Sequence, residues 1–225
     1  MTDTLGLLYA DKADEYFGHA RTEILPLLPP GRVDRILEVG CGRGDTLAHL
    51  RTEGRCRWTC GVELFPEAGE AARARLDEVY VGNIEHLELP IAPASLDVVL
   101  CLDVLEHLVD PWNTAQRLSL LLKPGGVLIA SIPNVRHFRV VLPLLFRGRW
   151  EYADFGLMDR THLRFFTRQS AIELLETAGL RVDAVHHSGL ESTHKKALMA
   201  LSFGKLEAFF VFQYLLRGVR ASSPR

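Results

Sequence analysis

Apolar and polar positions alternate along the chain in a pattern that predicts strands separated by helices. Strand-like runs occur at RILEVG, CRWTCGVEL, EVYVGN, LDVVLCLDV, GVLIASIP and RVDAVHHS. Segments with helical spacing lie between them, at DTLAHLRTEG, PEAGEAARARL, DPWNTAQRLSLLL and TRQSAIELLETAGL. Most of the strands are nearly all apolar, which is typical of strands buried on both faces. The pattern therefore predicts an α/β fold with helices on both faces of a mostly parallel sheet.

Three segments lie outside this alternation. A helix is predicted over DKADEYFGHARTEILPLL, before the breaker Pro29-Pro30-Gly31, so that residues 1–31 form an N-terminal helical cap. A last strand is predicted over FFVFQYLLRGV. Residues 134–166 interrupt the pattern with many aromatic residues and arginines, and a connection of this length usually has a function, often as a lid. We expect a single domain over residues 1–225.

Composition narrows the class of protein. The chain has 225 residues, of which 48% are hydrophobic and 24% charged, as expected for one globular domain. A formal charge of −2 argues against a nucleic-acid-binding protein. The first residues are acidic rather than basic, and the apolar stretch LEAFFVFQYLL is shorter than the roughly 20 residues of a membrane span. We expect a cytoplasmic protein without a transmembrane segment.

The cysteines do not indicate a disulfide framework. The four are Cys41, Cys56, Cys60 and Cys101, and they lie in apolar stretches without a C-x-x-C pair. We expect reduced, buried thiols rather than disulfides or a zinc site.

A glycine-rich loop carries the first chemical signal. Gly40, Gly42 and Gly44 follow a predicted strand and precede a predicted helix, where a ligand can approach the main chain closely. Glu63 follows about 20 residues later at the end of the next strand, where a carboxylate can accept both hydroxyls of a ribose. Together, the loop and Glu63 indicate a ligand that contains a nucleoside.

The kind of nucleoside depends on Glu38. The loop spacing is G-x-G-x-G, whereas a dinucleotide pyrophosphate favours G-x-G-x-x-G. Glu38 lies two residues before the first glycine, where it would repel a pyrophosphate but suit an ammonium group. Glu38 therefore favours a nucleoside that carries an amino acid over NAD. The alternative is that Glu38 only caps the loop that follows it.

The order of motifs resembles the class I S-adenosylmethionine-dependent methyltransferases. ILEVGCGRG with Glu63 resembles their first motif, and VGNIEHLELP, LDVVLCLDVLEHLVDP and LLKPGGVLIASIPN resemble the segments around their third to fifth strands. DRTHLRFFTRQSAIELLETAGL is similar to the ubiquinone-biosynthesis-like O-methyltransferases. The resemblance covers roughly residues 33–217. It implies a Rossmann-like, doubly wound sheet of seven mostly parallel strands, with the last strand antiparallel.

The resemblance also implies which residues bind the cofactor, S-adenosylmethionine. Glu38 and the loop would hold its methionine and ribose side, Glu63 the ribose hydroxyls and Leu102 with Asp103 the sulfonium end. The full set is Arg21, Glu38, Gly40, Cys41, Gly42, Gly44, Glu63, Leu64, Asn83, Ile84, Leu102 and Asp103. Asn83 stands where the family usually has an acid that bonds the adenine amine. Arg21 matches an arginine that reaches the cofactor's carboxylate, but it also fits a solvated charge on a helix face.

Methyl transfer to oxygen needs a base near the acceptor, and histidine is the usual residue at neutral pH. His107 follows the fourth strand and His162 ends the insertion, so both are candidate catalytic residues. Each also fits a structural histidine bonded to a backbone carbonyl. Glu106 beside His107 suggests a metal pair, but neighbours on a helix point apart, and we expect no metal.

The insertion 134–166 would cover the acceptor. Its arginines, aromatic residues and apolar run suit a small molecule that is anionic, partly apolar or glycan-like, such as a sugar, lipid-linked or secondary-metabolite substrate. An amphipathic helix at 136–149 that contacts a membrane surface is a second interpretation, and a helix packed on the core with solvated arginines is a third. The other functions left open are a NAD-dependent oxidoreductase or sugar-nucleotide enzyme, and a non-catalytic cofactor-binding subunit. The sequence indicates no oligomeric state.

Overall fold

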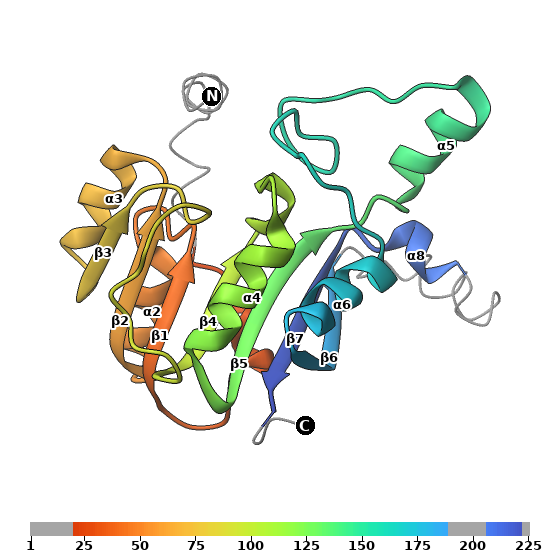
Figure 1. Ribbon diagram of the computed structural model, residues 1–225. Helices are drawn as coiled ribbons and strands as arrows, with labels where there is room; N and C mark the ends of the chain where they lie inside the picture. Colours follow the sequence, from red (N-terminus) through yellow and green to blue (C-terminus); the bar gives the residue numbers. More distant parts are fainter. Residues whose placement is uncertain (1–19, 189–205, 222–225) are drawn as a thin grey trace.

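A seven-stranded sheet in the order β3-β2-β1-β4-β5-β7-β6 runs through the computed structural model, which describes residues 20–188 and 206–221 (Figure 1). The strands are β1 Val33–Val39, β2 Cys56–Glu63, β3 Glu78–Val81, β4 Leu96–Leu102, β5 Leu122–Pro133, β6 Leu180–Ser188 and β7 Gln213–Arg220. The α-helices are α2 Asp45–Thr52, α3 Pro66–Arg73, α4 Pro111–Leu121, α5 Phe138–Arg147, α6 Arg168–Thr177 and α8 Glu207–Phe210. Two 3-10 helices are η2 Thr22–Leu27 and η3 Leu105–His107.

Strand direction confirms the predicted topology. β1 to β5 pair in parallel, whereas β7 lies antiparallel between β5 and β6. The parallel strands all end at the edge of the sheet that is uppermost in Figure 1. The loops that follow β1, β2, β4 and β5 therefore meet at one edge.

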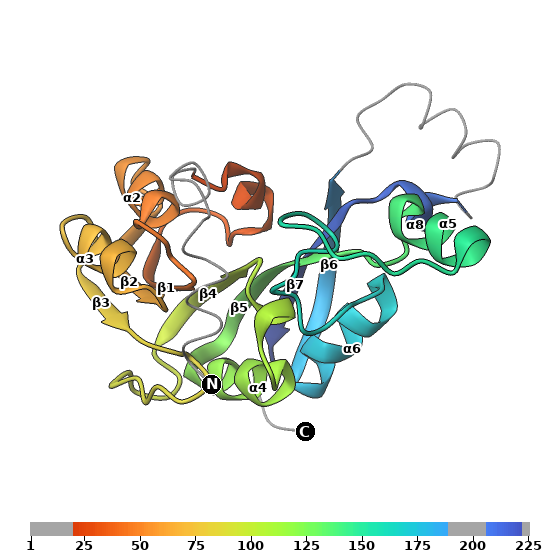
Figure 2. The same ribbon diagram turned by 90° about the horizontal axis from the view of Figure 1, so that it is seen from above.

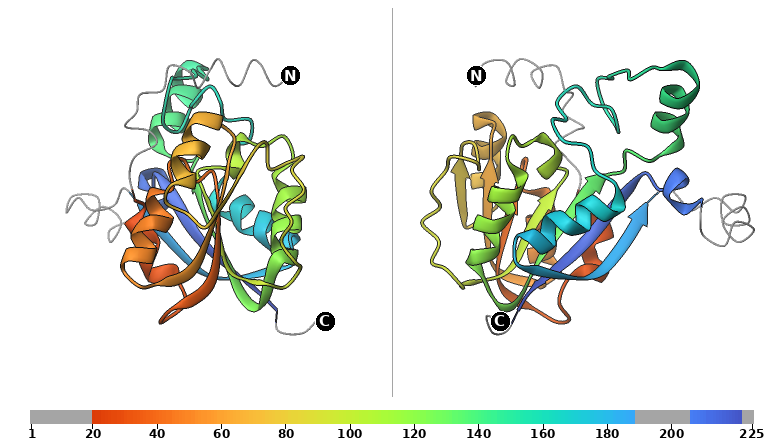
Figure 3. Two further views of the ribbon diagram at one scale, coloured as in Figure 1. Left: turned by 90° about the vertical axis from the view of Figure 1, so that its left-hand side faces the viewer. Right: turned by 45° about the vertical axis from the view of Figure 1, so that its right-hand side comes forward.

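The sheet is covered on both faces, as the apolar strands predict (Figures 2 and 3). α2 and α3 lie on one face, and α4 and α6 lie on the other. Successive side chains of β1 point to opposite faces of the sheet, as in any strand. Ile36 belongs to the core cluster that includes Leu47 of α2, and Leu37 to the cluster that includes Leu118 of α4.

The N-terminal helix differs from the prediction. Within the described part of the segment, only the 3-10 helix Thr22–Leu27 forms, and Arg21 is its N-cap rather than a residue inside a helix. Residues 11–19 of the predicted helix lie outside the described residues. Pro26 lies inside η2 and has no N–H to donate, which disfavours a regular α-helix there. Ile24 and Leu27 still pack into the core.

Two strand boundaries also differ. One strand is predicted over residues 209–219. In the structure the first residues of this run end the short helix α8, and β7 begins only at Gln213. β5 begins at Leu122, directly after α4, so that the breaker 123–126 lies within its irregular first residues rather than before it. Periodicity cannot place these boundaries, because short apolar runs fit a helix and a strand equally well.

The insertion 134–166 leaves the end of β5 and returns to it. An isolated bridge joins Asn134 to Phe166, and the N–H of Val135 donates to the carbonyl of Phe166 at 2.9 Å. Between these ends the chain forms α5, in which Val140 is the one buried residue.

The outer surface of α5 is apolar. Leu142, Leu144, Leu145 and Phe146 are all exposed, the last to 75%. Among the described residues α5 is therefore not a helix packed on the core, which disfavours the third interpretation of the insertion. Contact of this helix with a membrane surface stays a prediction. No helix in residues 20–188 and 206–221 is long and apolar enough to cross a membrane.

Candidate functional site

The loop between β1 and α2 follows the predicted glycine pattern. Gly40, Gly42 and Gly44 have φ angles of 69°, 54° and 80°, a region in which a side chain would be strained. Gly44 is the N-cap of α2. The loop lies at the edge where the parallel strands end, and the bound ligand of such sheets lies in this position.

A glycine that the sequence analysis did not single out makes room for this loop. A Cβ atom built on Gly61 of β2 would lie 2.5 Å from the Cys41 sulfur. Gly61 also pairs with Glu38 across the sheet. The missing side chain therefore lets the loop lie directly against β2.

Glu38 is buried in the middle of the sheet, between Gly61 of β2 and Leu100 of β4. Only 3% of it is exposed, and its Oε2 has no hydrogen-bond partner. Burial raises its pKa from 4.5 to about 8, while a hydrogen bond from Thr46 and the charge of Arg21 act in the opposite direction.

Four N–H groups of the loop donate to acceptors other than Glu38, which disfavours the alternative that Glu38 only caps the loop. The N–H groups of Gly40 and Cys41 donate to Val62, and that of Gly44 donates to Cys41. The N–H of Gly42 donates to Glu63. Glu38 thus keeps a buried, unpartnered carboxylate oxygen, which suits a cationic group.

The raised pKa of Glu38 predicts a pH-dependent stability. Between its ordinary pKa of 4.5 and its folded pKa of about 8, the folded protein holds a proton that the unfolded chain has lost. The free energy of unfolding should therefore fall as pH rises through this window, at about 1 kcal/mol per pH unit. Urea denaturation of the wild type and Glu38→Gln without cofactor measures this, and the variant should lose that part of the slope.

Other ionisable groups near Glu38 are Arg21, Asp45 and Glu63. They are present in both proteins, so the difference between the two slopes isolates Glu38. Equal slopes from pH 5 to 8 would show that the carboxyl of Glu38 ionises normally.

Glu63 ties the end of β2 to the glycine loop. Its Oε2 accepts from the N–H of Gly42 at 2.7 Å, and its Oε1 accepts from the N–H of Phe65 at 3.0 Å. Burial raises its pKa, and these N–H groups partly offset the rise. Each carboxylate oxygen can accept more than one hydrogen bond, so Glu63 retains acceptor capacity for hydroxyl groups.

The residues predicted around an adenine ring follow β2 and β3. Leu64 is exposed, and Ile84 is buried. The side-chain oxygen of Asn83 accepts from the N–H of Glu85 at 2.9 Å and so closes the turn after β3. Asn83 therefore stabilises the turn after β3 and lies at the edge where the parallel strands end.

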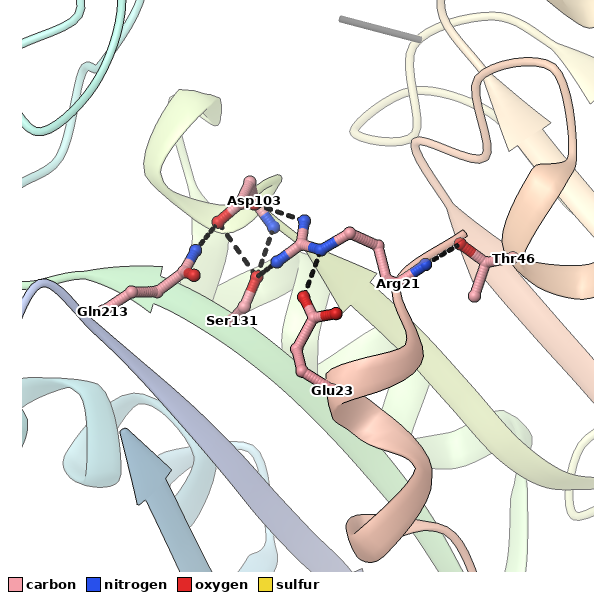
Figure 4. A network of polar contacts seen from close by, with 6 residues as sticks. All are labelled: Arg21, Glu23, Thr46, Asp103, Ser131 and Gln213. Atoms are coloured by element: carbon pink, nitrogen blue, oxygen red, sulfur yellow. Dashed lines mark hydrogen bonds and ion pairs between the residues drawn. The ribbon is translucent and has the colours of Figure 1, made fainter. Parts of the chain in front are cut away.

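Arg21 and Asp103 meet over the ends of β4 and β5 (Figure 4). The guanidinium of Arg21 pairs with Asp103 at 2.5 Å and donates to Ser131 at 3.3 Å, and it also pairs with Glu23. Burial alone would lower the pKa of Arg21, but the two carboxylates raise it overall. Arg21 is thus a partly buried residue of the site, and not a solvated charge.

Asp103 accepts several hydrogen bonds in the same network. Ser131 donates to it at 2.9 Å, and the amide of Gln213 at the start of β7 also donates to it. Asp103 has a φ of 56°, which is unusual for a residue with a side chain. Strain of this kind persists where neighbouring contacts impose it, and it is common at functional sites. Leu102 precedes it and is buried.

His107 and His162, which are far apart in the sequence, lie side by side. Their ring centroids are 4.7 Å apart with the rings nearly perpendicular. Nδ1 of His107 lies 3.1 Å from the carbonyl oxygen of Thr161, and Nδ1 of His162 lies 3.2 Å from that of Leu157. Both histidines therefore have the backbone bond that a structural role would need, and they also share one site.

Glu106 joins this pair, contrary to the expectation that it points away from His107. One potential ligand atom from each of Glu106, His107 and His162 lies within 4.8 Å of the others. η3 is a 3-10 helix of three residues, so the spacing of a regular α-helix surface does not apply to it.

The cysteines are free and buried, as predicted. Burial raises the pKa of each thiol, which keeps all four protonated and unreactive near neutral pH.

The site's geometry defines a class of protein. A glycine loop after β1, a carboxylate that ends β2 and an antiparallel seventh strand together describe a class I methyltransferase fold. The chain belongs to the methyltransferase domain family, whose sequence profile matches residues 9–185. It is an S-adenosylmethionine-dependent methyltransferase.

Individual relatives agree with this family. The chain is 29% identical over 179 residues to the ubiquinone biosynthesis O-methyltransferase of Albidiferax ferrireducens. The matched region covers 72% of this chain and 68% of that protein. It superposes with a TM-score of 0.67 on a chain from the complex of the Haloferax volcanii Trm112 methyltransferase activator and a methyltransferase, at 20% identity, with 98% and 96% covered. The S-adenosylmethionine-dependent methyltransferase of Mesorhizobium loti gives 0.62 at 17% identity, with 88% and 96% covered. These two structures share the fold.

Several residues of the site were not predicted from the sequence. Thr46, Gly61, Glu106, Ser131 and Gln213 all contact a predicted site residue or belong to its cluster. Thr46 and Gly61 lie close in sequence to the glycine loop and to Glu63, a proximity that could have drawn attention to them. Gln213 is brought in by the antiparallel strand, and nothing near it in the sequence marks it.

Proposed function

We propose that this methyltransferase transfers a methyl group to an oxygen atom of its acceptor. The observation that carries the proposal is the pair His107 and His162, with ring centroids 4.7 Å apart, at the edge where β4 ends. Transfer to a hydroxyl group requires that its proton be removed, and imidazoles are suited to this step near neutral pH. The relative from Albidiferax ferrireducens, named as an O-methyltransferase, gives independent support.

The proposed cofactor contacts follow from the polar atoms at this edge. S-adenosylmethionine supplies a methyl group already activated on a sulfonium. Glu38 fits the ammonium of the cofactor, because its buried Oε2 has no hydrogen-bond partner. Glu63 fits the ribose hydroxyls, and Asn83 lies where the adenine edge would be.

Arg21 has two candidate partners in this proposal. In the structure its guanidinium pairs with Asp103 and Glu23. A carboxylate of the bound cofactor would be a further partner for the same guanidinium. Arg21 would then hold the methionine end while Asp103 remains bonded to Ser131 and Gln213.

The acceptor side is formed by the insertion 134–166. His162 lies in it, and α5 exposes apolar side chains beside Arg139 and Arg147. We propose an acceptor that is partly apolar and carries anionic or hydroxyl groups, such as a sugar, lipid-linked or secondary-metabolite substrate.

A thermal-shift comparison and a transfer screen test this function. S-adenosylhomocysteine should raise the melting temperature, and NAD should leave it unchanged, because the G-x-G-x-G spacing of the loop differs from the G-x-G-x-x-G that favours a pyrophosphate. Labelled methyl groups should then appear on oxygen in a panel of sugar, quinol and phenol acceptors. Stabilisation by NAD alone would reject the cofactor contacts, and transfer only to nitrogen or carbon acceptors would reject the oxygen specificity.

A further inference from the structure

Three side chains of the types that bind transition metals converge beyond the end of β4. They are Glu106 and His107 of η3 and His162 of the insertion, and one ligand atom of each lies within 4.8 Å of the others. Separations of this size place three donors around a single point. Two histidines and one carboxylate are a recurrent set for divalent cations in proteins.

The backbone bonds of the two imidazoles leave Nε2 of each ring as the nitrogen that can bind a metal. A carbonyl oxygen only accepts hydrogen bonds, so Nδ1 of each ring must carry the proton that it shares with Thr161 or Leu157. In the neutral ring the lone pair then lies on Nε2. Histidine ligands usually have this second bond to a backbone carbonyl or carboxylate, which fixes the ring and its tautomer.

Glu106 gives a second, independent observation. It is only 1% exposed, and neither carboxylate oxygen has a hydrogen-bond partner from another residue. A buried carboxyl group with unpaired oxygens is costly, and a bound cation removes that cost.

The two segments that carry the three residues are joined by backbone bonds. The carbonyl of Glu106 accepts from the N–H groups of Leu163 and Arg164, both at 2.9 Å. The bond from His107 to Thr161 adds a third link between η3 and the insertion. The donors are therefore held in place by the fold before any ligand arrives, as a metal site requires.

We propose that Glu106, His107 and His162 bind one divalent cation of the zinc type, with open positions for an oxygen of the methyl acceptor. Two imidazoles and one carboxylate suit Zn²⁺, Mn²⁺ or Co²⁺, whereas Mg²⁺ prefers oxygen ligands. The inference rests on the proposed transfer to oxygen and changes the task of the histidines from base to ligand. It departs from the expectation that no metal is bound.

The cation would act on the acceptor hydroxyl. A hydroxyl bound to such a cation loses its proton near neutral pH, and the proton passes to water. The oxygen then forms a bond to the methyl carbon as the carbon–sulfur bond breaks, and the sulfur leaves as a neutral thioether. No oxidation or reduction is involved. No separate general base is needed.

Metal binding is measured directly on the full chain, purified without a histidine tag and treated with a chelator. Calorimetric titration with Zn²⁺ should show one site per chain with micromolar or tighter affinity, and Co²⁺ should give visible absorption bands. Glu106→Gln keeps the shape of the side chain and should weaken Zn²⁺ binding at least 100-fold, as should His162→Ala. His86→Ala, at an exposed histidine, is the matched control and should bind like the wild type.

The outcomes separate this inference from the proposed function. Absence of stoichiometric Zn²⁺ or Co²⁺ binding by the wild type, or equal binding by Glu106→Gln with an unchanged melting temperature, overturns the metal site. Methyl transfer to oxygen at full rate after chelation overturns the role of the cation but leaves the proposed function standing. Metal binding without transfer to any oxygen acceptor supports the site and counts against the proposed function.

Discussion

Replacement of Glu63 by alanine is expected to weaken binding of S-adenosylhomocysteine by about 100-fold or more. In our proposal this carboxylate accepts both ribose hydroxyls, and a hydrogen bond to a charged group contributes about 1.5–3 kcal/mol. Losing two such bonds corresponds to about 3 kcal/mol, or roughly 150-fold in affinity. The change also removes the acceptor of the Gly42 and Phe65 N–H groups and so loosens the loop. Calorimetric titration measures the affinity.

Two further variants make the test specific to the carboxylate. Glu67→Ala removes an exposed acid from the first turn of the adjacent helix α3 and should leave the affinity unchanged. Glu63→Gln keeps an acceptor oxygen and should fall between the wild type and Glu63→Ala. A change of less than threefold in Glu63→Ala would mean that the ribose lies elsewhere.

Substitution of Gly61 by alanine is expected to lower the free energy of unfolding by about 1–3 kcal/mol, the usual cost of an overpacked core. The new Cβ would lie 2.5 Å from the Cys41 sulfur, and both residues are held by the sheet and the loop. The displaced loop should also bind S-adenosylhomocysteine more weakly, because we propose that this loop contacts the cofactor. Chemical denaturation and titration measure the two effects.

Removal of the clashing sulfur should relieve this strain. Cys41→Ala in the Gly61→Ala background is expected to recover at least about 1 kcal/mol of stability, as a double-mutant cycle would show. Strictly additive effects would show that the two side chains do not meet, and would contradict the packing of the loop against β2.

The sheet and the position of the glycine loop at its edge could be predicted because their signals are local. The apolar runs that form β1, β2 and β4 are continuous, and burial on two faces requires them to be so. Glu38 and Glu63 could be assigned from their distances to the glycine loop. The 3-10 helix before β1 could not be predicted. The spacing of its apolar residues is that of a regular α-helix, but Pro26 and the packing of Ile24 oppose one.

The cluster of Glu106, His107 and His162 depends on contacts between distant segments. His107 and His162 were each predicted to have a role, but periodicity does not show that their rings touch. Glu106 was set aside on the geometry of an α-helix, and the three-residue η3 does not have that geometry. Arg21 meets Asp103 only because tertiary packing brings Arg21, the N-cap of η2, to the ends of β4 and β5.

The position of β7 has a consequence for synthesis of the protein. Of the seven strands in the described sheet β7 is the last in the chain, yet it fills the space between β5 and β6. A nascent chain that stops before Gln213 leaves one long side of β5 unpaired, and Asp103 then lacks the amide that Gln213 donates. Unpaired strand edges of this kind favour aggregation. Pairing of β5 with β7 therefore completes both the sheet and the site only when translation has passed residue 220.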